Sequence, residues 1–227
     1  MFMRGPGFLI LLAALAVFAF PQYAAADDAI GMVSEYTVRP DDTLYKIARR
    51  FDLGAVELVA ANPGINTKPL KAGQNLTLPT RHLLPAVKRE GIVIDLSVMR
   101  LFYFSGTQAP LTFPVAVGRK GWETRTGITT VVMKRRHPAW VPPDSIRAED
   151  PALPAIVPPG PNNPLGDHAL SLGWEGYLIH GTNSPSSIGK RVSHGCIRLY
   201  PEDIAVLFAA VKEGTPVTII NGSRLSP

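Results

Sequence analysis

Cys196, the one cysteine of the chain, lies in the segment VSHGCIRLY (192–200), between His194 and Arg198. A thiol attacks a carbonyl carbon as a thiolate, so a reactive cysteine near neutral pH needs a base or a lowered pKa. A second histidine, His180, ends the run GYLIH upstream. A histidine that ends one strand can face a cysteine that opens the next, and this combination is suited to nucleophilic attack on an amide or ester.

Two glycines lie directly beside the candidate nucleophile and base: Gly195 precedes Cys196, and Gly181 follows His180. Glycine keeps space free and permits backbone angles that other residues avoid. Backbone N–H groups near Gly195 and Cys196 could therefore bind the oxyanion that develops when a carbonyl is attacked.

Each of these side chains also has a purely structural interpretation. Free cysteine is among the most buried residue types, and a lone histidine on an apolar strand, as His180 is, is often a satisfied core residue. His194 could bond a loop carbonyl, and Arg198 could be half of a surface ion pair. These explanations weaken because one short segment supplies a cysteine, two histidines and two glycines together.

Metal and redox chemistry fit these residues less well. A cysteine and two histidines could ligate zinc, but their spacing matches no zinc pattern and no carboxylate lies beside them. A thiol redox protein would need a C-x-x-C pair, which a chain with one cysteine lacks. We therefore expect neither a metal nor another cofactor.

The part of the chain that contains these residues, about 91–222, is rich in short β-type runs. IVIDL and RLFYF are separated by residues 97–99 and predict a hairpin, and LTFPVAV, GITTVVM, ALSLG, GYLIH and PVTII follow. One helix is predicted over 201–211, where Pro201 suits the first position and acidic residues occupy the first turn. Residues 138–166 are rich in proline, and an ordered loop of that length is often functional.

Residues 34–80 predict a much smaller module. EYTV alternates like a strand, and a helix with an N-cap at Asp41 or Asp42 and an end at Gly54 follows it. Its apolar face has the spacing i, i+3, i+4 and i+7, at Leu44, Ile47, Ala48 and Phe51. A second helix over 56–61 and the strand QNLTL complete a βααβ unit, whose small core is typical of binding. Residues 81–90 are predicted to be a linker.

Residues 1–26 have the layout of a cleavable secretory signal: Arg4, an apolar run from Phe8 to Phe20, and a small-residue site at 24–26. The run is shorter than the ~20 residues that a membrane-spanning helix needs, and an uncleaved anchor is the alternative. We expect an exported protein that starts near Asp27, has no membrane span after cleavage, and ends in a tail at 223–227.

The charge excludes one class of partner. The chain has 23 Lys and Arg residues against 18 Asp and Glu, a net charge of +5, and the basic residues are scattered. No basic stripe with interleaved aromatic residues is present, so we expect no nucleic acid.

The segment HGTNSPSSIGKRVSHGCIRL resembles the active-site signature of the L,D-transpeptidase catalytic domain, also called the YkuD domain. The segments VGRKGWETRTG, HPAWVPP and PGPNNPLG are also similar to parts of that family, and together they cover about 91–220. One departure is Arg125, where many relatives have proline. The resemblance implies a mainly β domain, a β-sandwich with a short helix.

Residues 35–79 resemble a LysM domain, through YTVRPDDTLYKIARRF, the ANPGIN turn and LKAGQNLTLP. The resemblance implies binding to glycans that contain N-acetylglucosamine, including peptidoglycan. The loops that would bind are near Arg39–Thr43 and Asn62–Ala72.

The transpeptidase resemblance also implies roles for the residues of the signature. Cys196 would be the nucleophile, and His180 the general base, oriented by a carbonyl such as that of Gly181. His194, which follows Ser193 in the Ser-His-Gly-Cys motif, would shape the site and assist polarisation. The N–H groups of Gly195 and Cys196 would bind the oxyanion. Arg198 would hold Cys196 in place or meet a substrate carboxylate.

The implied reaction takes place on peptidoglycan in the periplasm. Cys196 would attack the bond between the diamino acid and the terminal D-Ala of a tetrapeptide stem, and an amine would then take the acyl group from the thioester. The acceptor would be a diaminopimelate side chain (a 3→3 cross-link), the C-terminal lysine of an outer-membrane lipoprotein, or water. The pairing with LysM is similar to the lipoprotein-anchoring subgroup, and carbapenems would acylate Cys196. The alternatives are an L,D-carboxypeptidase, a Cys-His wall-peptide hydrolase, and a LysM wall-binding protein with an inactive second domain.

Overall fold

The computed structural model describes residues 28–66, 69–106 and 108–222. The expected signal (1–26) and tail (223–227) lie outside the described residues, as do residues 67 and 68 of the expected LysM loop Asn62–Ala72. Among the described residues, no helix combines the length and the apolar character needed to cross a membrane.

The N-terminal module has the predicted βααβ order: β2 (Ser34–Thr37), α1 (Leu44–Arg50), α2 (Ala55–Ala60) and β3 (Asn75–Leu78). β2 and β3 pair antiparallel, which brings the two ends of the module together. The predicted apolar face of α1 is buried at Leu44, Ile47 and Ala48, with Phe51 partly buried against the same core.

The cap of α1 differs from the prediction of Asp41 or Asp42. Thr43 is the N-cap, and its hydroxyl accepts a hydrogen bond from the Lys46 N–H at 3.2 Å. The Asp42 carboxylate instead accepts from the Tyr36 hydroxyl at 2.6 Å, so it stabilises the turn before the helix. Asp41 has φ +66°, a left-handed conformation that is also part of this turn.

The residues that join the elements of the module also differ from the prediction. Gly54, expected to end the first helix, is the N-cap of α2, because α1 already ends at Arg50. The predicted linker 81–90 contains a short strand, β4 (His82–Leu83), which pairs antiparallel with β1 (Ala29–Ile30).

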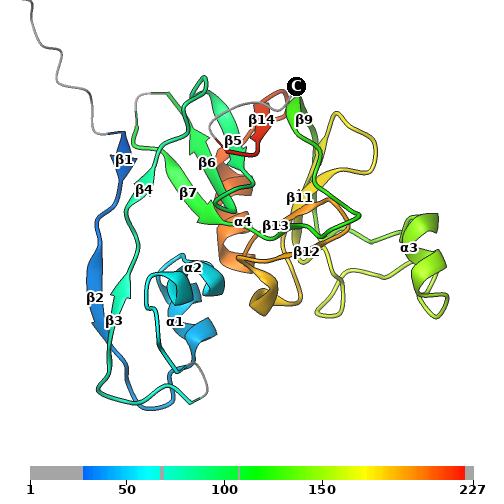
Figure 1. The fold of residues 1–227 in the computed structure, drawn as a ribbon. Coiled ribbons are helices and arrows are strands. Elements are labelled where there is room, and N and C mark those ends of the chain that lie inside the picture. The colour runs from blue at the N-terminus through cyan, green and yellow to red at the C-terminus, as the bar shows by residue number, and fades with distance from the viewer. Residues whose placement is uncertain (1–27, 67–68, 107, 223–227) are drawn as a thin grey trace, which may run out of the picture.

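The large domain is built on one eight-stranded sheet with the order β13-β11-β10-β9-β14-β5-β6-β7 (Figure 1). Its strands are β5 (Gly91–Asp95), β6 (Arg100–Phe104), β7 (Leu111–Pro114), β9 (Gly127–Arg136), β10 (His168–Leu172), β11 (Leu178–His180), β13 (Ile197–Arg198) and β14 (Pro216–Ile220). β5 and β6 form the predicted hairpin. The pairs β14–β5 and β11–β13 are parallel, and the other neighbours are antiparallel.

The sheet curls until its two edges meet. Ala116, which follows β7, forms an antiparallel bridge with Arg198 of β13, with both N–H···O distances at 2.9 Å. Next to this bridge, β8 (Val117–Gly118) pairs in parallel with β12 (Arg191–Ser193). The predicted mainly β architecture is confirmed, and the expected two-layer core is enclosed by one curled sheet.

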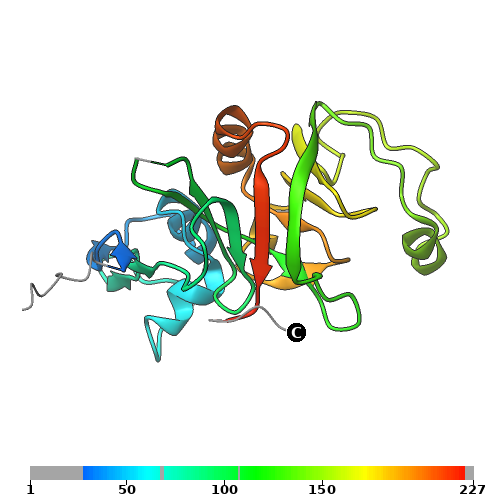
Figure 2. The ribbon, with the colours of Figure 1, turned by 90° about the horizontal axis from the view of Figure 1, so that it is seen from above.

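The alternation of side chains gives the sheet two distinct faces at the β9–β13 end. Leu170, Ile179 and Ile197 are fully buried in the core that α4 (Pro201–Ala210) covers. This helix is the one predicted over 201–211, and it lies along one side of the sheet (Figure 2). The intervening residues of the same strands point to the opposite face, because successive side chains of a strand alternate.

The proline-rich residues 138–166 form a long excursion between β9 and β10, here called the α3 segment. It contains α3 (Asp144–Glu149) and projects from the sheet on the side away from the N-terminal module (Figure 2). A bridge between Trp140 and Val157 joins its two arms. At its base, the buried Asn163 amide donates to the carbonyl of Pro138 at 2.8 Å. These bonds give the segment a defined shape without a core of its own.

The N-terminal module packs directly on the large domain. Its backbone touches the β11–β12 connection, which includes the 3₁₀ turn η1 (Pro185–Ser187): a Cβ built on Gly189 would lie 2.5 Å from the Gly54 Cα. The buried Tyr200 hydroxyl donates to the Leu53 carbonyl at 3.1 Å. Only glycine at both 54 and 189 permits the two backbones to approach so closely.

A buried charge reinforces this contact. Arg100 of β6 is 2% exposed, and its Nη2 donates to the Glu57 carboxylate at 3.1 Å and to the Asp52 carbonyl at 2.8 Å. Asp203 of α4 is also buried here, and burial, with Asp52 next in effect, raises its pKa to about 8. The junction therefore contains a buried ion pair, Arg100 with Glu57, and a buried carboxyl, Asp203, that stays protonated at neutral pH.

Candidate active site

β11 and β13 form the floor of a cavity of about 820 Å³. Their parallel register pairs Ile179 with Ile197 and His180 with Arg198. Ile179 and Ile197 face the core, while His180, Cys196 and Arg198 line the cavity. The register places Arg198, and not Cys196, directly opposite His180, and Cys196 precedes β13 while lining the same cavity as His180.

His180 is held as a neutral base. Its Nδ1 lies 2.7 Å from the Gly181 carbonyl oxygen, the partner that the sequence comparison suggested. Because a carbonyl only accepts, Nδ1 carries the proton and Nε2 keeps its lone pair. Burial, and then the positive Arg198, lower the pKa of His180 to about 3, so the ring is uncharged at neutral pH.

Cys196 is a partly buried thiol. Its Sγ donates to the Gly176 carbonyl at 3.4 Å, across the cavity wall. Burial raises the pKa of the Cys196 thiol, and the hydrogen bond from the Leu178 backbone and the charge of Arg198 oppose that rise only in part. The resting cysteine is therefore a thiol, and a base must take its proton before or during attack.

Gly195 shapes the turn before the cysteine through its backbone. It has φ +103°, a conformation that side-chain-bearing residues rarely adopt. Its N–H donates to the Ser193 hydroxyl at 3.2 Å, and the Ser193 hydroxyl donates to the Cys196 carbonyl at 2.5 Å. Of the two expected oxyanion donors, the Gly195 N–H is thus occupied by Ser193, whereas the Cys196 N–H has no partner within the described residues.

A buried threonine ties this turn to the rest of the cavity wall. The Thr124 hydroxyl donates to the Gly195 carbonyl at 2.8 Å and accepts from the Gly118 N–H at 2.9 Å. The loop 118–124 is therefore fixed to the backbone beside the nucleophile.

His194 is half-buried and belongs to a network that the sequence did not reveal. Its Nε2 lies 2.9 Å from Glu149 Oε2 and 2.9 Å from Arg119 Nη2, and the Trp122 ring packs against it edge-on at 4.9 Å. Because a carboxylate only accepts, Nε2 donates to Glu149; Arg119 Nη2, which donates to the same oxygen at 2.6 Å, then lies beside Nε2 as a second donor and does not bond it. The hydrogen bond from His194, followed by those from Arg119 and Trp122, lowers the pKa of Glu149.

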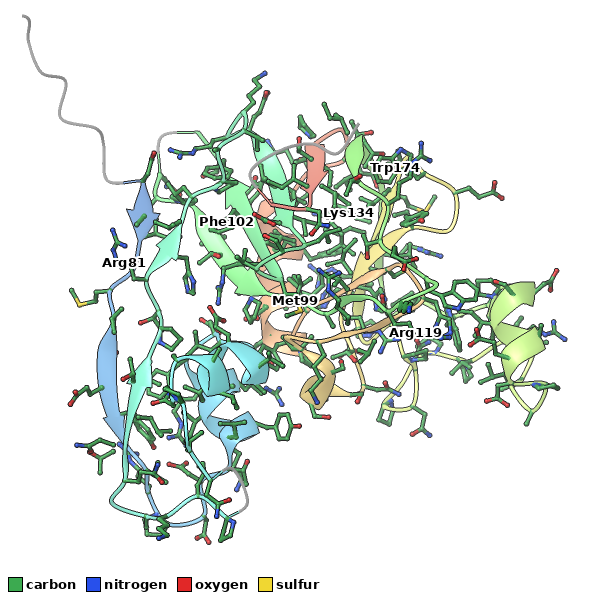
Figure 3. The ribbon with its side chains drawn as sticks, viewed as in Figure 1. Arg81, Met99, Phe102, Arg119, Lys134 and Trp174 are labelled. Carbon is green, nitrogen blue, oxygen red and sulfur yellow. The ribbon has the colours of Figure 1, made fainter. Side chains whose placement is uncertain are left out.

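The α3 segment touches the predicted active site in two ways: residues such as Trp140, Pro143 and Ile146 line the cavity, and the exposed Glu149 carboxylate bonds His194. Glu149 is the last residue of α3, and in Figure 3 the Arg119 side chain lies on the side of the strands that faces this helix. The proline-rich composition of 138–166 indicated a functional loop but gave no signal for Glu149 itself, because its partners are 27 to 45 residues away in sequence.

Arg198 lies on the cavity floor without the bond to Cys196 that was one of its two expected roles. Its backbone forms the Ala116 bridge, but none of the hydrogen bonds or ion pairs of the described residues involves its guanidinium. Burial lowers the pKa of Arg198. The described residues contain no cluster of three or more His, Cys, Asp or Glu side chains that could hold a metal ion.

Family comparisons identify both modules of the chain. The model of the L,D-transpeptidase catalytic domain, YkuD, matches residues 89–219, and the LysM domain model matches residues 36–79. The chain belongs to the L,D-transpeptidase family. The cavity, the signature residues and the eight-stranded sheet, apart from its last residue Ile220, fall within the span of the first match.

Individual relatives are similar over most of this chain. It is 42% identical over 212 residues to the probable L,D-transpeptidase YcfS of Escherichia coli K12, a match that covers 89% of this chain and 66% of that protein. It is 38% identical over 226 residues to the probable L,D-transpeptidase ErfK/SrfK of Salmonella typhimurium LT2, covering 95% and 72%. Among solved structures, the Ldtfm–avibactam carbamoyl enzyme is 22% identical with a TM-score of 0.49, covering 67% of this chain and 54% of that one.

The departure at Arg125 is accommodated locally. Its guanidinium stacks over the Trp174 ring at 4.6 Å, next to Thr124 but outside the wall of the cavity. The L,D-transpeptidase signature around Cys196 is therefore not altered by this substitution.

Proposed function

We propose that the protein is a peptidoglycan L,D-transpeptidase in which Cys196 is the nucleophile and His180 the general base. One observation carries the proposal: a neutral histidine, whose Nδ1 is bonded to the Gly181 carbonyl, lines the same cavity as the sole cysteine. A base with a fixed tautomer beside a protonated thiol is the arrangement that nucleophilic acyl transfer requires.

In the first half of the reaction, Cys196 attacks the carbonyl between the diamino acid and the terminal D-Ala of a tetrapeptide stem. The S–C bond forms as His180 Nε2 takes the thiol proton, and the oxyanion is stabilised by the free Cys196 N–H. When the C–N bond breaks, the proton passes from His180 to the leaving D-Ala amine. A thioester remains on Cys196.

In the second half, an amine attacks the thioester and gives a proton to His180. The S–C bond breaks, a new amide forms, and the proton returns to the Cys196 sulfur. A diaminopimelate amine as acceptor gives a 3→3 cross-link, and the terminal lysine of an outer-membrane lipoprotein gives an anchored lipoprotein. Water as acceptor would make the enzyme an L,D-carboxypeptidase.

His194 and Glu149 act as positioning residues in this scheme. The Glu149 carboxylate fixes the His194 ring against Trp122 at one wall of the cavity. This wall limits how the peptide stem of the substrate can enter the cavity. His194 and Glu149 themselves transfer no proton in the reaction.

The N-terminal LysM module binds the glycan strands of the wall. The two matched domain families support association with the cell wall. Cleavage after Ala26 of the predicted signal would leave the enzyme in the periplasm, and N-terminal sequencing of the protein from a periplasmic extract tests that position.

Product mass spectrometry tests the reaction. The protein from Asp27 onward and its Cys196→Ala variant are incubated with disaccharide-tetrapeptide muropeptides, with and without a peptide that ends in lysine. A cross-linked dimer that lacks one D-Ala, or a peptide–tripeptide conjugate, is expected only with the unchanged cysteine. A carbapenem should add its mass to the unchanged protein and not to the variant.

The other outcomes separate the rival functions. Tripeptide monomers alone would support an L,D-carboxypeptidase, and cleavage at other peptide bonds would support a Cys-His wall-peptide hydrolase. The absence of any product, together with an unchanged mass after carbapenem exposure, would contradict the proposal and favour a wall-binding protein with an inactive second domain.

A further inference from the structure

Two arginines face the cavity from opposite sides of His180. Across neighbouring strands, Arg135 of β9 pairs with Ala169, Ala169 with His180, and His180 with Arg198 of β13. Residues that pair directly in adjacent strands project to the same side of a sheet. The four residues therefore form one row, and Arg135, His180 and Arg198 all line the cavity.

These two half-buried side chains, here called the cavity arginines, lack hydrogen-bond partners for their buried Nε atoms. In each, Nε is buried and has no hydrogen-bond partner within the described part of the chain. Arg135 has one long side-chain bond, from Nη2 to the Ser171 hydroxyl at 3.4 Å. The two acidic residues on the cavity wall, Glu123 and Glu175, are exposed and form no ion pair with either arginine.

Two other arginines of the described residues, both at least half-buried, have the carboxylate partner that the cavity arginines lack. Arg100 is paired with the Glu57 carboxylate at 3.1 Å, and the half-buried Arg119 with the Glu149 carboxylate at 2.6 Å. A guanidinium removed from water is costly unless an anion compensates it. The cavity arginines therefore indicate that an anion enters with the ligand.

We propose that the cavity arginines bind two carboxylates of the acyl-donor stem peptide, one on each side of the bond that is attacked. Arg198, one strand from His180 and two residues from Cys196, binds the carboxylate of the D-Ala that leaves. Arg135, two strand spacings or about 10 Å from His180, binds the carboxylate at the end of the diamino acid side chain. A guanidinium fork matches a carboxylate with two parallel hydrogen bonds, which makes these contacts selective.

This inference rests on the proposed function and explains its substrate preference. A stem whose side chain ends in an amide, or in an amine without a carboxylate, lacks the anion for Arg135. A donor whose terminal D-Ala is amidated lacks the anion for Arg198. Each loss leaves a half-buried guanidinium without its anion, so donor discrimination should exceed that of an exposed ion pair.

The test compares release of the terminal residue from two muropeptide donors, one with a free and one with an amidated diaminopimelate carboxylate. For the unchanged enzyme, kcat/KM should fall roughly 10- to 100-fold on the amidated donor. Arg135→Gln should lose a similar factor on the free donor and little more on the amidated one. Arg136→Gln is the matched control, because Arg136 is exposed and stacks on Phe208 on the opposite face of the sheet.

The same design applies to Arg198 with a donor that ends in D-alaninamide. Equal losses for Arg135→Gln on both diaminopimelate donors would assign Arg135 a structural role and overturn the proposal. If a variant fails to fold, the comparison of free and amidated donors on the unchanged enzyme decides alone: equal rates refute the subsite. Equal rates together with an inactive Cys196→Ala variant would leave the proposed function standing, whereas a fully active Cys196→Ala variant would refute that function itself.

Discussion

The N-terminal module and the tip of the α3 segment lie on opposite sides of the large domain and contact it in different ways (Figure 1). The module is joined through a backbone-to-backbone contact at Gly189 and through Arg100, which is 2% exposed. The α3 tip is joined through Glu149, whose side chain is 43% exposed. Contacts removed from water are costly to break, whereas exposed ion contacts contribute little and are screened by salt. The N-terminal module is thus held firmly against the large domain, whereas the contact between the α3 tip and His194 costs little to break.

The pH dependence of stability tests the buried junction first. The pKa of Asp203 is raised to about 8, so the folded state retains a proton that the unfolded chain loses near pH 4. The contribution of protonated Asp203 to the free energy of unfolding is fully present below about pH 4 and is lost as pH rises through about 8. The loss is at most about 1.4 kcal/mol per pH unit. Asp203→Asn should abolish this fall of the free energy of unfolding with pH, which urea unfolding from pH 4 to 9 measures.

Glu202, the neighbour of Asp203, is the control with the opposite sign. A hydrogen bond from Arg49 lowers the pKa of Glu202, so its contribution is present above its usual range and is lost as pH falls. A slope that Asp203→Asn leaves unchanged would show that the Asp203 carboxyl is hydrated and that the junction is not buried.

Arg100→Met should destabilise the protein by about 3–5 kcal/mol, because the Glu57 carboxylate loses its buried partner. Arg49→Gln breaks the exposed pair with Glu202 at the same junction and should cost less than about 1 kcal/mol. Chemical denaturation of both variants compares the two pairs. Similar losses would contradict the distinction between buried and exposed contacts.

Gly189→Ala should separate the module from the large domain. Gly189 has φ +80°, and an added Cβ would lie 2.5 Å from the Gly54 Cα. The left-handed conformation alone costs an alanine about 1–2 kcal/mol. Gly64→Ala is matched, because Gly64 also has φ +80° but a Cβ there would meet nothing within 4 Å. A rise in protease cleavage between the domains with Gly189→Ala only is expected, and equal behaviour would show that the contact is dispensable.

Glu149→Gln should leave the free energy of unfolding almost unchanged, because this carboxylate is exposed. It should lower kcat several-fold with little change in KM, since His194 loses its anionic partner. Activity of the unchanged enzyme should fall with added salt, and that of Glu149→Gln should not. Glu175→Gln is the control, because Glu175 is an exposed carboxylate on the cavity wall, and an equal effect of both substitutions would remove the special role of Glu149.

Periodicity predicted the regular elements because it reflects burial directly. The apolar face of α1, the β5–β6 hairpin and the helix at Pro201 were all predicted from local spacing. The N-cap was missed because Thr43 and Asp42 are both suitable, and only the bond between Asp42 and Tyr36 decides which one caps the helix.

The candidate site was predicted where its residues are close in sequence and missed where they are not. The segment 192–198 and His180 fall on paired strands, so their types and spacing were sufficient to predict one site. Glu149 reaches His194 only through the path of the α3 segment, and Arg135 reaches the cavity only through the β9–β10 register; no local pattern encodes either.

The contact between Gly54 and Gly189 has a consequence for work on a polymer. A glycan strand held by the LysM loops would meet Cys196 at one set spacing, because the module has no free linker over which to swing. The enzyme would then select peptide stems by their position. Only stems that leave the glycan strand at the matching rotation and distance would reach the Cys196 thiol, and neighbouring stems would not react.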